Sequence, residues 1–361
     1  MSAQEASPLV LITGGAGFIG TNLAERLLSA GQRVLVFDNL SRAGVRHNVE
    51  WLCKQFPGRV NLEVADVRDA NAVTRAVARA DRVYHFAAQV AVTTSLEDPT
   101  NDFEINARGT LNVLEAIRRG RSSAALVVTS TNKVYGGLDD VELRKEGQRY
   151  APVSTHLREH GVNESRGLDF HSPYGCSKGA ADQYVLDYAR SYGLRAVVFR
   201  MSCIYGPHQF GNEDQGWVAH FLIRARQGRQ IVIYGDGCQV RDVLYVDDLV
   251  EALTLAGAKI DTLKGRAFNI GGGARNTLSL LELVDQIEKR LGRPVDLQFS
   301  SWRQGDQRYY VTDTGRFENA TGWRPQIPPS LGLDQLQTWL DQLTPPGAGP
   351  VGRPYPQTVQ I

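Results

Sequence analysis

The sequence predicts an α/β protein built on a doubly wound parallel sheet, with a smaller, partly interleaved α/β domain after it. Three observations support this prediction. Short apolar runs rich in β-branched residues alternate with amphipathic stretches up to about residue 203. A glycine-rich turn follows the first apolar run, and mixed shorter elements replace the regular alternation after residue 203.

The strands and helices of the large sheet can be taken in order. Residues 9–13 (LVLIT) predict a strand buried on both faces, because the run is apolar and a glycine turn follows it. An amphipathic helix extends to about residue 30, and a second strand ends at Asp38. Because strands that alternate with helices run parallel, helices are expected on both faces of the sheet. The further elements predicted are strands over 61–66, 82–88, 125–130 and 195–200, and helices over 102–118 and 174–192.

Composition excludes several classes of function. With 42% hydrophobic and 22% charged residues, the 361-residue chain is ordinary for a globular protein of one large or two modest domains. A formal net charge of +1 gives no reason to expect nucleic acid or a membrane surface as partner. No apolar run approaches the roughly 20 residues that span a bilayer, and the N-terminus lacks a signal core, so a cytoplasmic protein is expected. The four cysteines have no paired spacing, so neither disulfides nor a metal site is indicated.

The glycine-rich turn T-G-G-A-G-F-I-G contains Gly14, Gly17 and Gly20 and lies between the first strand and the first helix. Such turns bring backbone N–H groups to a helix N-terminus, where they can hold a pyrophosphate. Asp38 follows Gly20 by 18 residues, close to the position of a ribose-binding carboxylate. A carboxylate there repels a 2′-phosphate and favours NAD over NADP, whereas Arg42 nearby could pair with that phosphate. The chain is therefore expected to bind NAD in a Rossmann-type domain.

Other candidate cofactor contacts lie where predicted strands end, because ligands of parallel sheets bind beyond the carboxyl ends of the strands. The full set of cofactor candidates is Gly14, Gly17, Phe18, Ile19, Asp38, Asn39, Ser41, Arg42, Asp66, Val67, Ala87, Ala88, Gln89, Asn106, Thr129, Tyr174, Lys178 and Met201. The domains expected around this site are residues 1–202 with part of 239–262 for the cofactor, and 203–344 for the substrate. Residues 345–361 are rich in proline and glycine without periodicity, which indicates an extended or disordered arm.

Tyr174 and Lys178 are candidates for proton transfer. Pro173 suits the first turn of a helix, which places Tyr174 and Lys178 at i and i+4 on one helix face. A free phenol titrates near ~10, and an ammonium held against it favours the phenolate, so Lys178 is expected to lower the pKa of Tyr174. The spacing alone is weak evidence, because tyrosine and lysine four apart are usually a surface pair. Its weight comes from the other motifs.

With the glycine turn, Asp38, S-T-N-K-V-Y-G (130–136) and Y-G-C-S-K (174–178), the chain resembles the extended short-chain dehydrogenase/reductases that modify nucleotide sugars. The resemblance extends from residue 9 to about residue 343. It implies that Tyr174 is the acid or base on a sugar hydroxyl. It also implies that Lys178 binds the nicotinamide ribose and that Thr131 hydrogen-bonds the same hydroxyl as Tyr174.

Three features narrow the choice within that family. The sugar-nucleotide dehydratases carry Asp-Glu after the equivalent of Thr131, whereas this chain has Asn132 and Lys133, which disfavours a dehydratase. Tyr135 and Tyr174 are 39 residues apart, much further than in simple 4-epimerases, and the polar segment 138–172 between them resembles an active-site flap. The runs EDQGW, QVRDVLYVDD and GDQR resemble the CDP-paratose (CDP-tyvelose) 2-epimerases, so C2 inversion through a transient keto sugar is implied by resemblance alone.

The resemblance also implies the substrate contacts. Arg241 and Arg303 match arginines that grip the diphosphate, which suits the forked guanidinium group. The substrate candidates are Gln89, Thr131, Asn132, Lys133, His171, Ser202, Gln209, Gln215, Arg241, Arg303 and Asp306. Two alternatives stay open, a UDP-sugar 4-epimerase of the same family and a non-catalytic NAD-binding sensor. The helices over 102–118 and 174–192 resemble the pair that forms a dimer interface in this family, so a homodimer or homotetramer is expected.

Overall fold

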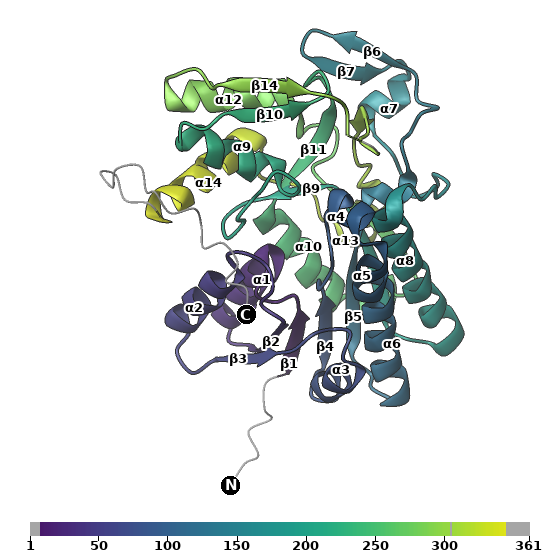
Figure 1. Cartoon of the computed structure of the whole chain (residues 1–361). Coiled ribbons are helices and arrows are strands. Elements are labelled where there is room, and N and C mark those ends of the chain that lie inside the picture. The colour runs from purple at the N-terminus through teal and green to yellow at the C-terminus, as the bar shows by residue number, and fades with distance from the viewer. Residues whose placement is uncertain (1–7, 304, 344–361) are drawn as a thin grey trace.

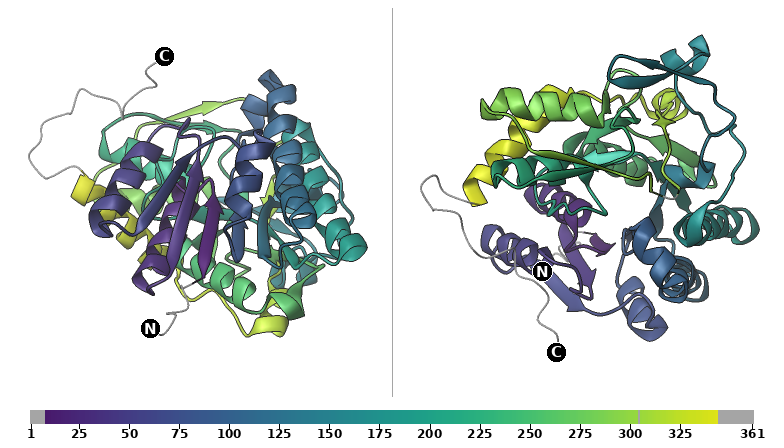
Figure 2. Two further views of the ribbon diagram at one scale, coloured as in Figure 1. Left: turned by 90° about the horizontal axis from the view of Figure 1, so that it is seen from below. Right: turned by 45° about the horizontal axis from the view of Figure 1, so that its top comes forward.

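The computed structural model describes residues 8–303 and 305–343, and the predicted arm over 345–361 lies outside the described residues. Its centre is a seven-stranded sheet whose strands, in spatial order β12-β8-β5-β4-β1-β2-β3, all run parallel. Helices cover both faces (Figures 1 and 2), which confirms the predicted doubly wound sheet. The strands are β1 Leu9–Thr13, β2 Arg33–Asp38, β3 Val60–Val64, β4 Arg82–His85, β5 Ala125–Thr131, β8 Ala196–Met201 and β12 Ala267–Ile270.

The sheet separates two apolar layers, because side chains alternate between the faces of a strand. Val10 and Ile12 of β1 pack with α1 (Phe18–Ser29), α2 (Val45–Gln55) and α10 (Val246–Ala258). Leu11 points to the other face, toward α3 (Ala70–Val77), α6 (Gly109–Arg119) and α8 (Ser172–Tyr192). Both faces of β1 are therefore apolar, as the uninterrupted run predicts.

The helix expected over 102–118 is divided into three parts. It begins with α5 (Pro99–Phe103), continues as a π-helix, η1 (Glu104–Arg108), and ends as α6. The Asp98 side chain caps the start by accepting a hydrogen bond from Asn101 N. Helical periodicity does not reveal a π turn, which inserts a single residue and is frequent at functional sites.

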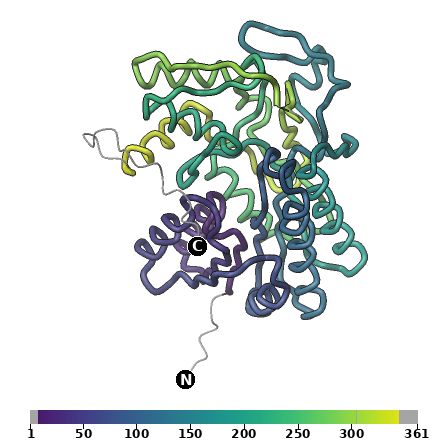
Figure 3. Tube along the Cα trace, viewed as in Figure 1, coloured from purple at the N-terminus to yellow at the C-terminus, as the bar shows by residue number. Residues whose placement is uncertain are grey.

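The rest of the chain forms a smaller unit above the carboxyl edge of the sheet. Here β10 (Ile231–Tyr234) pairs with β14 (Leu297–Ser300), and β11 (Val240–Tyr245) pairs with β9, β13 and β15 (Cys203–Tyr205, Thr277–Ser279, Tyr309–Tyr310). Helices α9 (Trp217–Arg226), α12 (Leu280–Leu291) and α14 (Pro329–Leu343) complete it. The trace in Figure 3 shows the chain returning to the large sheet through α10.

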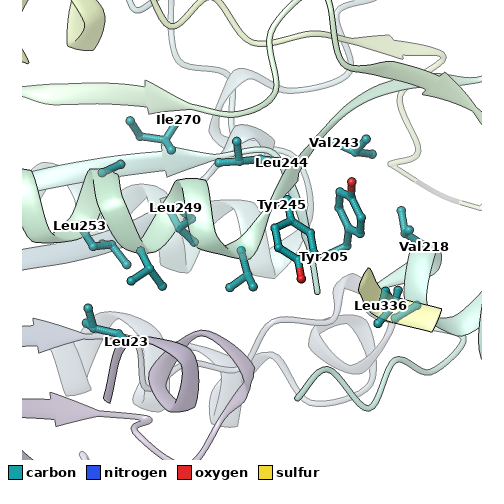
Figure 4. Close-up of a cluster of buried hydrophobic side chains, with 14 of the residues drawn as sticks. Leu23, Tyr205, Val218, Val243, Leu244, Tyr245, Leu249, Leu253, Ile270 and Leu336 are labelled. Carbon is teal, nitrogen blue, oxygen red and sulfur yellow. The ribbon is translucent and has the colours of Figure 1, made fainter. Parts of the chain in front are cut away.

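The expected division at residue 202 needs one correction. Strand β12 is expected in the smaller domain, but it pairs with β8 as the edge strand of the large sheet. Helix α10 packs on α1 and β5, within the stretch expected to return to the first domain. Figure 4 shows why the two parts share one core: Leu249 and Leu253 of α10 lie between Leu23 of α1 and Leu244 of β11.

The remaining elements are short connections. Segment 138–172 contains the hairpin β6 (Leu143–Glu146) and β7 (Arg149–Pro152), followed by α7 (Thr155–Glu159). The others are α4 (Val92–Glu97), η2 (Asn132–Tyr135), α11 (Ile260–Leu263) and α13 (Gly315–Thr321). Within the described ranges, no helix combines the length and the apolar character that crossing a bilayer requires.

A buried ion pair joins α8 to the sheet and gives a test of the fold. Arg200 on β8 and Asp182 on α8 form two hydrogen bonds of 2.8 and 2.9 Å, and their side chains are 5% and 0% exposed. Replacing Asp182 with Ala leaves a buried, unpaired guanidinium, which should lower the free energy of unfolding by about 3–5 kcal/mol. Asp187→Ala is the matched control on the same helix, because Asp187 pairs with the exposed Arg190. If urea titration shows the same loss in the free energy of unfolding for both variants, this account is contradicted.

Candidate active site

A cavity of about 860 Å³ lies along the carboxyl edge of the large sheet, between the sheet and the smaller unit. The glycine turn, the ends of β2, β4 and β5 and the start of α8 line its lower part. Residues from β10, β11 and the loop before α9 line its upper part. This is the edge at which doubly wound sheets bind their ligands.

The glycine turn fits a bound pyrophosphate. Gly14 has φ +67°, and a Cβ there would lie 2.6 Å from the backbone nitrogen of Ala87 at the end of β4. At Gly20, a Cβ would lie 2.4 Å from the carbonyl oxygen of Gly14. Both positions therefore require glycine, and the tight turn directs the N-terminus of α1 at the cavity, where its free N–H groups favour an anion.

Asp38 is held in place by the backbone at the end of β2. Its Oδ2 accepts a hydrogen bond from Ala16 N at 3.1 Å and its Oδ1 accepts one from Leu40 N at 2.8 Å. Burial raises the pKa of this carboxyl, and the two backbone donors oppose the rise. Arg42, the residue that could favour NADP, donates across the cavity to Gln215 Oε1. The carboxylate thus remains available to ribose hydroxyls, as NAD requires.

The other predicted cofactor contacts lie on this cavity, with one exception. Asn106 is buried and does not line it. Its side chain bonds both backbone groups of Gln89, accepting from the nitrogen at 2.9 Å and donating to the oxygen at 3.0 Å. Asn106 therefore acts on the site indirectly, by fixing the loop after β4 and by donating to Ser177 Oγ on α8 at 3.0 Å. The predicted cofactor contacts that line the cavity are Gly14, Gly17, Phe18, Ile19, Asp38, Asn39, Ser41, Arg42, Asp66, Val67, Ala87, Ala88, Gln89, Thr129, Tyr174, Lys178 and Met201.

Thr131, Tyr174 and Lys178 are buried and face this cavity together. Thr131 ends β5, and the first turns of α8 carry the other two. Helix α8 begins with proline in its first turn, as expected, and Tyr174 N donates to Ser95 Oγ at 3.1 Å. The three side chains are therefore brought together by a strand and a helix that are far apart in the sequence.

The expected effect of Lys178 on Tyr174 is not seen in this structure. Burial raises the pKa of Tyr174 to about 12, and the hydrogen bond with Thr131 and the charge of Arg42 only partly oppose it. Lys178 donates its Nζ to the carbonyl oxygen of Thr129 at 2.7 Å instead of to the phenol. Burial also lowers the pKa of Lys178 to about 8. Additional positive charge is therefore needed before Tyr174 can act as a base at neutral pH.

Most of the predicted substrate contacts lie in the upper part of the cavity. Arg241 pairs with Asp306 at 2.8 Å, and Arg303 stacks on the ring of Tyr234 with its guanidinium carbon 3.7 Å from the centroid. Lys133 donates to the carbonyl oxygen of Gly305 at 3.0 Å. The predicted substrate contacts that line the cavity are Gln89, Thr131, Asn132, Lys133, Ser202, Gln209, Gln215, Arg241, Arg303 and Asp306.

Two predictions need correction: segment 138–172 is not a flap over the cavity, and His171 does not line it. None of residues 138–172, all of which the structure describes, lines the cavity. The segment packs behind the smaller unit, where Arg149 pairs with Glu282 at 2.8 Å and Tyr150 N donates to Cys238 O. His171 is exposed and lies 3.0 Å from Asp169, outside the cavity. Polarity alone does not distinguish a flap from a segment that packs on another surface.

Trp217, Tyr234 and Gln239 line the cavity without having been predicted as contacts, although Trp217 and Gln239 belong to the runs EDQGW and QVRDVLYVDD. Trp217 donates its Nε1 to Cys203 Sγ at 3.3 Å, and Tyr234 supplies the platform under Arg303. Gln239 donates to Tyr234 O at 2.6 Å, and its Oε1 has no partner among the residues described. They come from the start of α9, the end of β10 and the loop before β11, so only the folded structure brings them together. No group of three potential metal ligands occurs within the described ranges.

The glycine turn, the held carboxylate and the buried Tyr174–Lys178 pair define a protein that binds a dinucleotide beside an acid–base group. The comparisons with known proteins extend this conclusion. Residues 10–271 match the NAD dependent epimerase/dehydratase family, and the chain belongs to that family. The family's cofactor, NAD, fits the residues described above.

Individual relatives cover nearly the whole chain. The CDP-paratose 2-epimerase of Salmonella typhi is 44% identical over 343 residues, which are 92% of this chain and 99% of that protein. A UDP-glucose 4-epimerase of Mycolicibacterium smegmatis is 32% identical, with 90% and 95% covered. The structure of the Thermus thermophilus UDP-glucose 4-epimerase in complex with NAD superposes with a TM-score of 0.76 at 34% identity, covering 92% and 98%.

The held carboxylate of Asp38 predicts the cofactor preference. Asp38→Ala should weaken NAD binding by about 10- to 100-fold, the range for losing a hydrogen bond to a charged group. NADP binding should weaken less, because removal of the negative charge also removes a repulsion. Equilibrium titration with both dinucleotides measures this. Glu63→Ala is the control, since Glu63 pairs with Arg79 outside the cavity. Wild-type protein that prefers NADP would contradict the assignment.

Proposed function

We propose that this protein is an NAD-dependent nucleotide-sugar 2-epimerase that interconverts CDP-paratose and CDP-tyvelose. The observation that carries the proposal is the 44% identity to a CDP-paratose 2-epimerase over nearly the full length of both chains. The convergence of Thr131, Tyr174 and Lys178 on the same cavity as the glycine turn supports it. A non-catalytic NAD-binding sensor would not need these proton-transfer groups.

The reaction inverts one carbon through a ketone. When bound, NAD supplies the acceptor for the hydride at C2 and a positive charge near the phenol. Tyr174 takes the proton of the 2-hydroxyl group, and Thr131 orients that hydroxyl. The sugar then presents the other face of its ketone, and Tyr174 returns the proton as the C–H bond forms again. The hydride from C2 and the proton of the 2-hydroxyl group are both returned to the sugar, so no external reductant is consumed.

The upper part of the cavity suits a diphosphate. Arg241, Arg303 and Lys133 bring three cationic groups to it, and two of them pair with acids that the diphosphate can displace. Asn132 and Lys133 occupy the two positions where a dehydratase carries acids. Asn132 donates to Gln307 Oε1 at 3.3 Å. This arrangement favours proton transfer at oxygen over proton abstraction at carbon.

The second candidate is a UDP-sugar 4-epimerase. It is favoured by the relatives of that name that match most of the chain at 32% and 34% identity. The same residues can perform chemistry at C4, since the carbon that is oxidised depends on how the sugar is oriented. Identity to the 2-epimerase is higher, which decides the order of the two candidates.

We also infer that the chain forms a homodimer or a homotetramer in the cytoplasm. Leu96, Phe103, Tyr184 and Tyr192 are 43–54% exposed on the neighbouring helices α4, α5 and α8 (Figure 1), which supports a helix-mediated interface. All four cysteines, each within the described residues, are free thiols, which suits a reducing compartment. The division into a cofactor domain and a substrate domain remains part of this proposal.

The fate of hydrogen at C2 tests the function and its mechanism together. The protein is incubated with CDP-, UDP- and dTDP-sugars, and the products are analysed by NMR. We expect inversion of the CDP-sugar at C2, with no deuterium incorporated in D₂O and full retention of a deuterium placed at C2. Wash-out of the label would exclude hydride transfer. Inversion at C4 of a UDP-sugar would establish the second candidate instead.

The role of the phenol predicts a selective loss of rate. Tyr174→Phe should reduce turnover by ~10²–10⁴-fold, the usual contribution of general acid–base catalysis. NAD affinity and the unfolding midpoint should stay close to wild type, because the ring still fills its site. Tyr150→Phe is the control, because its hydroxyl bonds Asp236 and the residue does not line the cavity. A Tyr174→Phe enzyme with a near-normal single-turnover rate would remove Tyr174 from the mechanism.

A further inference from the structure

Asp102 is a buried carboxylate behind the catalytic helix, and the mechanism above does not use it. It belongs to α5, which packs beside α8 (Figure 1), and its side chain is fully buried. Its Oδ2 accepts a hydrogen bond from Ser177 Oγ at 2.5 Å, and its Oδ1 accepts one from Asn106 Nδ2 at 3.1 Å. Ser177 immediately precedes Lys178 on α8, so Asp102 contacts the helix one residue before the lysine.

Lys178 needs a compensating charge, because a buried ammonium is costly unless an anion accompanies it. Its Nζ donates to the neutral carbonyl oxygen of Thr129, which supplies no such charge. Asp182 and Asp102 are the two carboxylates whose charges act on it. Asp182 has the larger effect of the two on the pKa of Lys178, but both of its oxygens are bound by Arg200. Asp102 has no cation within ion-pair distance in the described part of the chain.

We propose that Asp102 is the counter-ion of Lys178 across Ser177, and that this positioning residue keeps the lysine charged for cofactor binding. The inference rests on the proposed function only in taking Lys178 as a contact of the nicotinamide ribose. It adds a residue that none of the motifs marks. The hydrogen bonds of Asp102 show that its neighbourhood is built to hold a carboxylate, because both donors point at it.

The other charged groups around Lys178 do not replace Asp102. Tyr174 on the same helix is neutral, with its pKa raised by burial, and Arg42 from the loop after β2 acts on Tyr174. His85 on β4 is buried between Thr13 and Thr110, and burial together with Lys178 lowers its pKa to about 3, so it stays uncharged. Asp182 is committed to its ion pair with Arg200. Asp102 is the other carboxylate that acts on Lys178, and it forms no ion pair of its own among the described residues.

The pH dependence follows from the sign of this interaction. The pKa of Lys178 is about 8, with the carboxylates raising it against the effect of burial. Lys178 therefore holds its charge below about pH 8 and loses it as the pH rises through that value. Removing the charge of Asp102 lowers the pKa of Lys178 further. The loss of NAD binding on the alkaline side should then occur at a lower pH.

The test measures NAD affinity as a function of pH, independently of turnover, in wild type and in Asp102→Asn. The amide can still accept from Asn106 and donate to Ser177, whose hydroxyl already lies 3.2 Å from Tyr174 O. We expect the alkaline fall in affinity to move down by about one pH unit, a shift typical of a lost neighbouring charge. Asp102→Ser is a second uncharged variant, in case the amide impairs folding.

Two matched controls separate charge from structure. Glu104→Gln removes one negative charge from the adjacent helix turn, where Glu104 lies 4.0 Å from Arg108, and it should leave the profile unchanged. Ser177→Ala removes the hydroxyl that bonds Asp102 but keeps the charge of Asp102. In this variant the fall in NAD affinity at alkaline pH should occur near the wild-type pH.

If Asp102→Asn or Asp102→Ser folds and its NAD affinity falls at the same pH as in wild type, the proposal is overturned, even if Lys178→Ala abolishes NAD binding. A Lys178→Ala protein that binds NAD as tightly as wild type would instead remove Lys178 from the proposed function. The two failures are therefore distinguishable.

Discussion

The parallel direction of the seven strands is the constraint on which the site depends. Because every strand of the large sheet ends at the same edge, residues from positions 14 to 201 of the chain are collected on one cavity. The glycine turn follows β1, Asp38 ends β2, and Thr131 ends β5. Helix α8 packs on one face of the sheet, and its first turns add Tyr174 and Lys178 at this edge. An antiparallel strand in this sheet would send its terminal residue to the opposite edge.

Burial gives this site its chemistry and also its main electrostatic cost. The same desolvation that lowers the pKa of Lys178 raises that of Tyr174, so both groups are biased toward their neutral forms. The surrounding charges partly oppose this bias, and Asp182 and Arg200 neutralise each other beneath the helix. Proton transfer at neutral pH therefore depends on charge delivered with the ligands. Such a site is least reactive when it is empty, which limits side reactions.

The sequence predicted the parts of the fold that rest on local pattern. Apolar strands, the glycine turn and the i, i+4 pair on α8 depend only on neighbouring residues, and all of them occur where expected. The errors concern long-range packing. Strand β12 is a short apolar run like those of the smaller unit, and only its pairing with β8 places it in the large sheet. Asn106 and His171 have suitable chemistry for a site, but their orientations depend on partners that no motif encodes.

Segment 138–172 shows how such packing can still serve the site. Val162 accepts a backbone hydrogen bond from Asp313 and a side-chain hydrogen bond from Asn269 of β12, and it donates to Val311 next to β15. Glu164 accepts from Asn269 N at 2.7 Å. One stretch of chain thus joins the edge of the large sheet to the smaller unit on the side away from the cavity. These bonds connect β12 of the sheet to the residues beside β15, a neighbour of β11, the strand that carries Arg241, so a segment that does not line the cavity supports both of its sides.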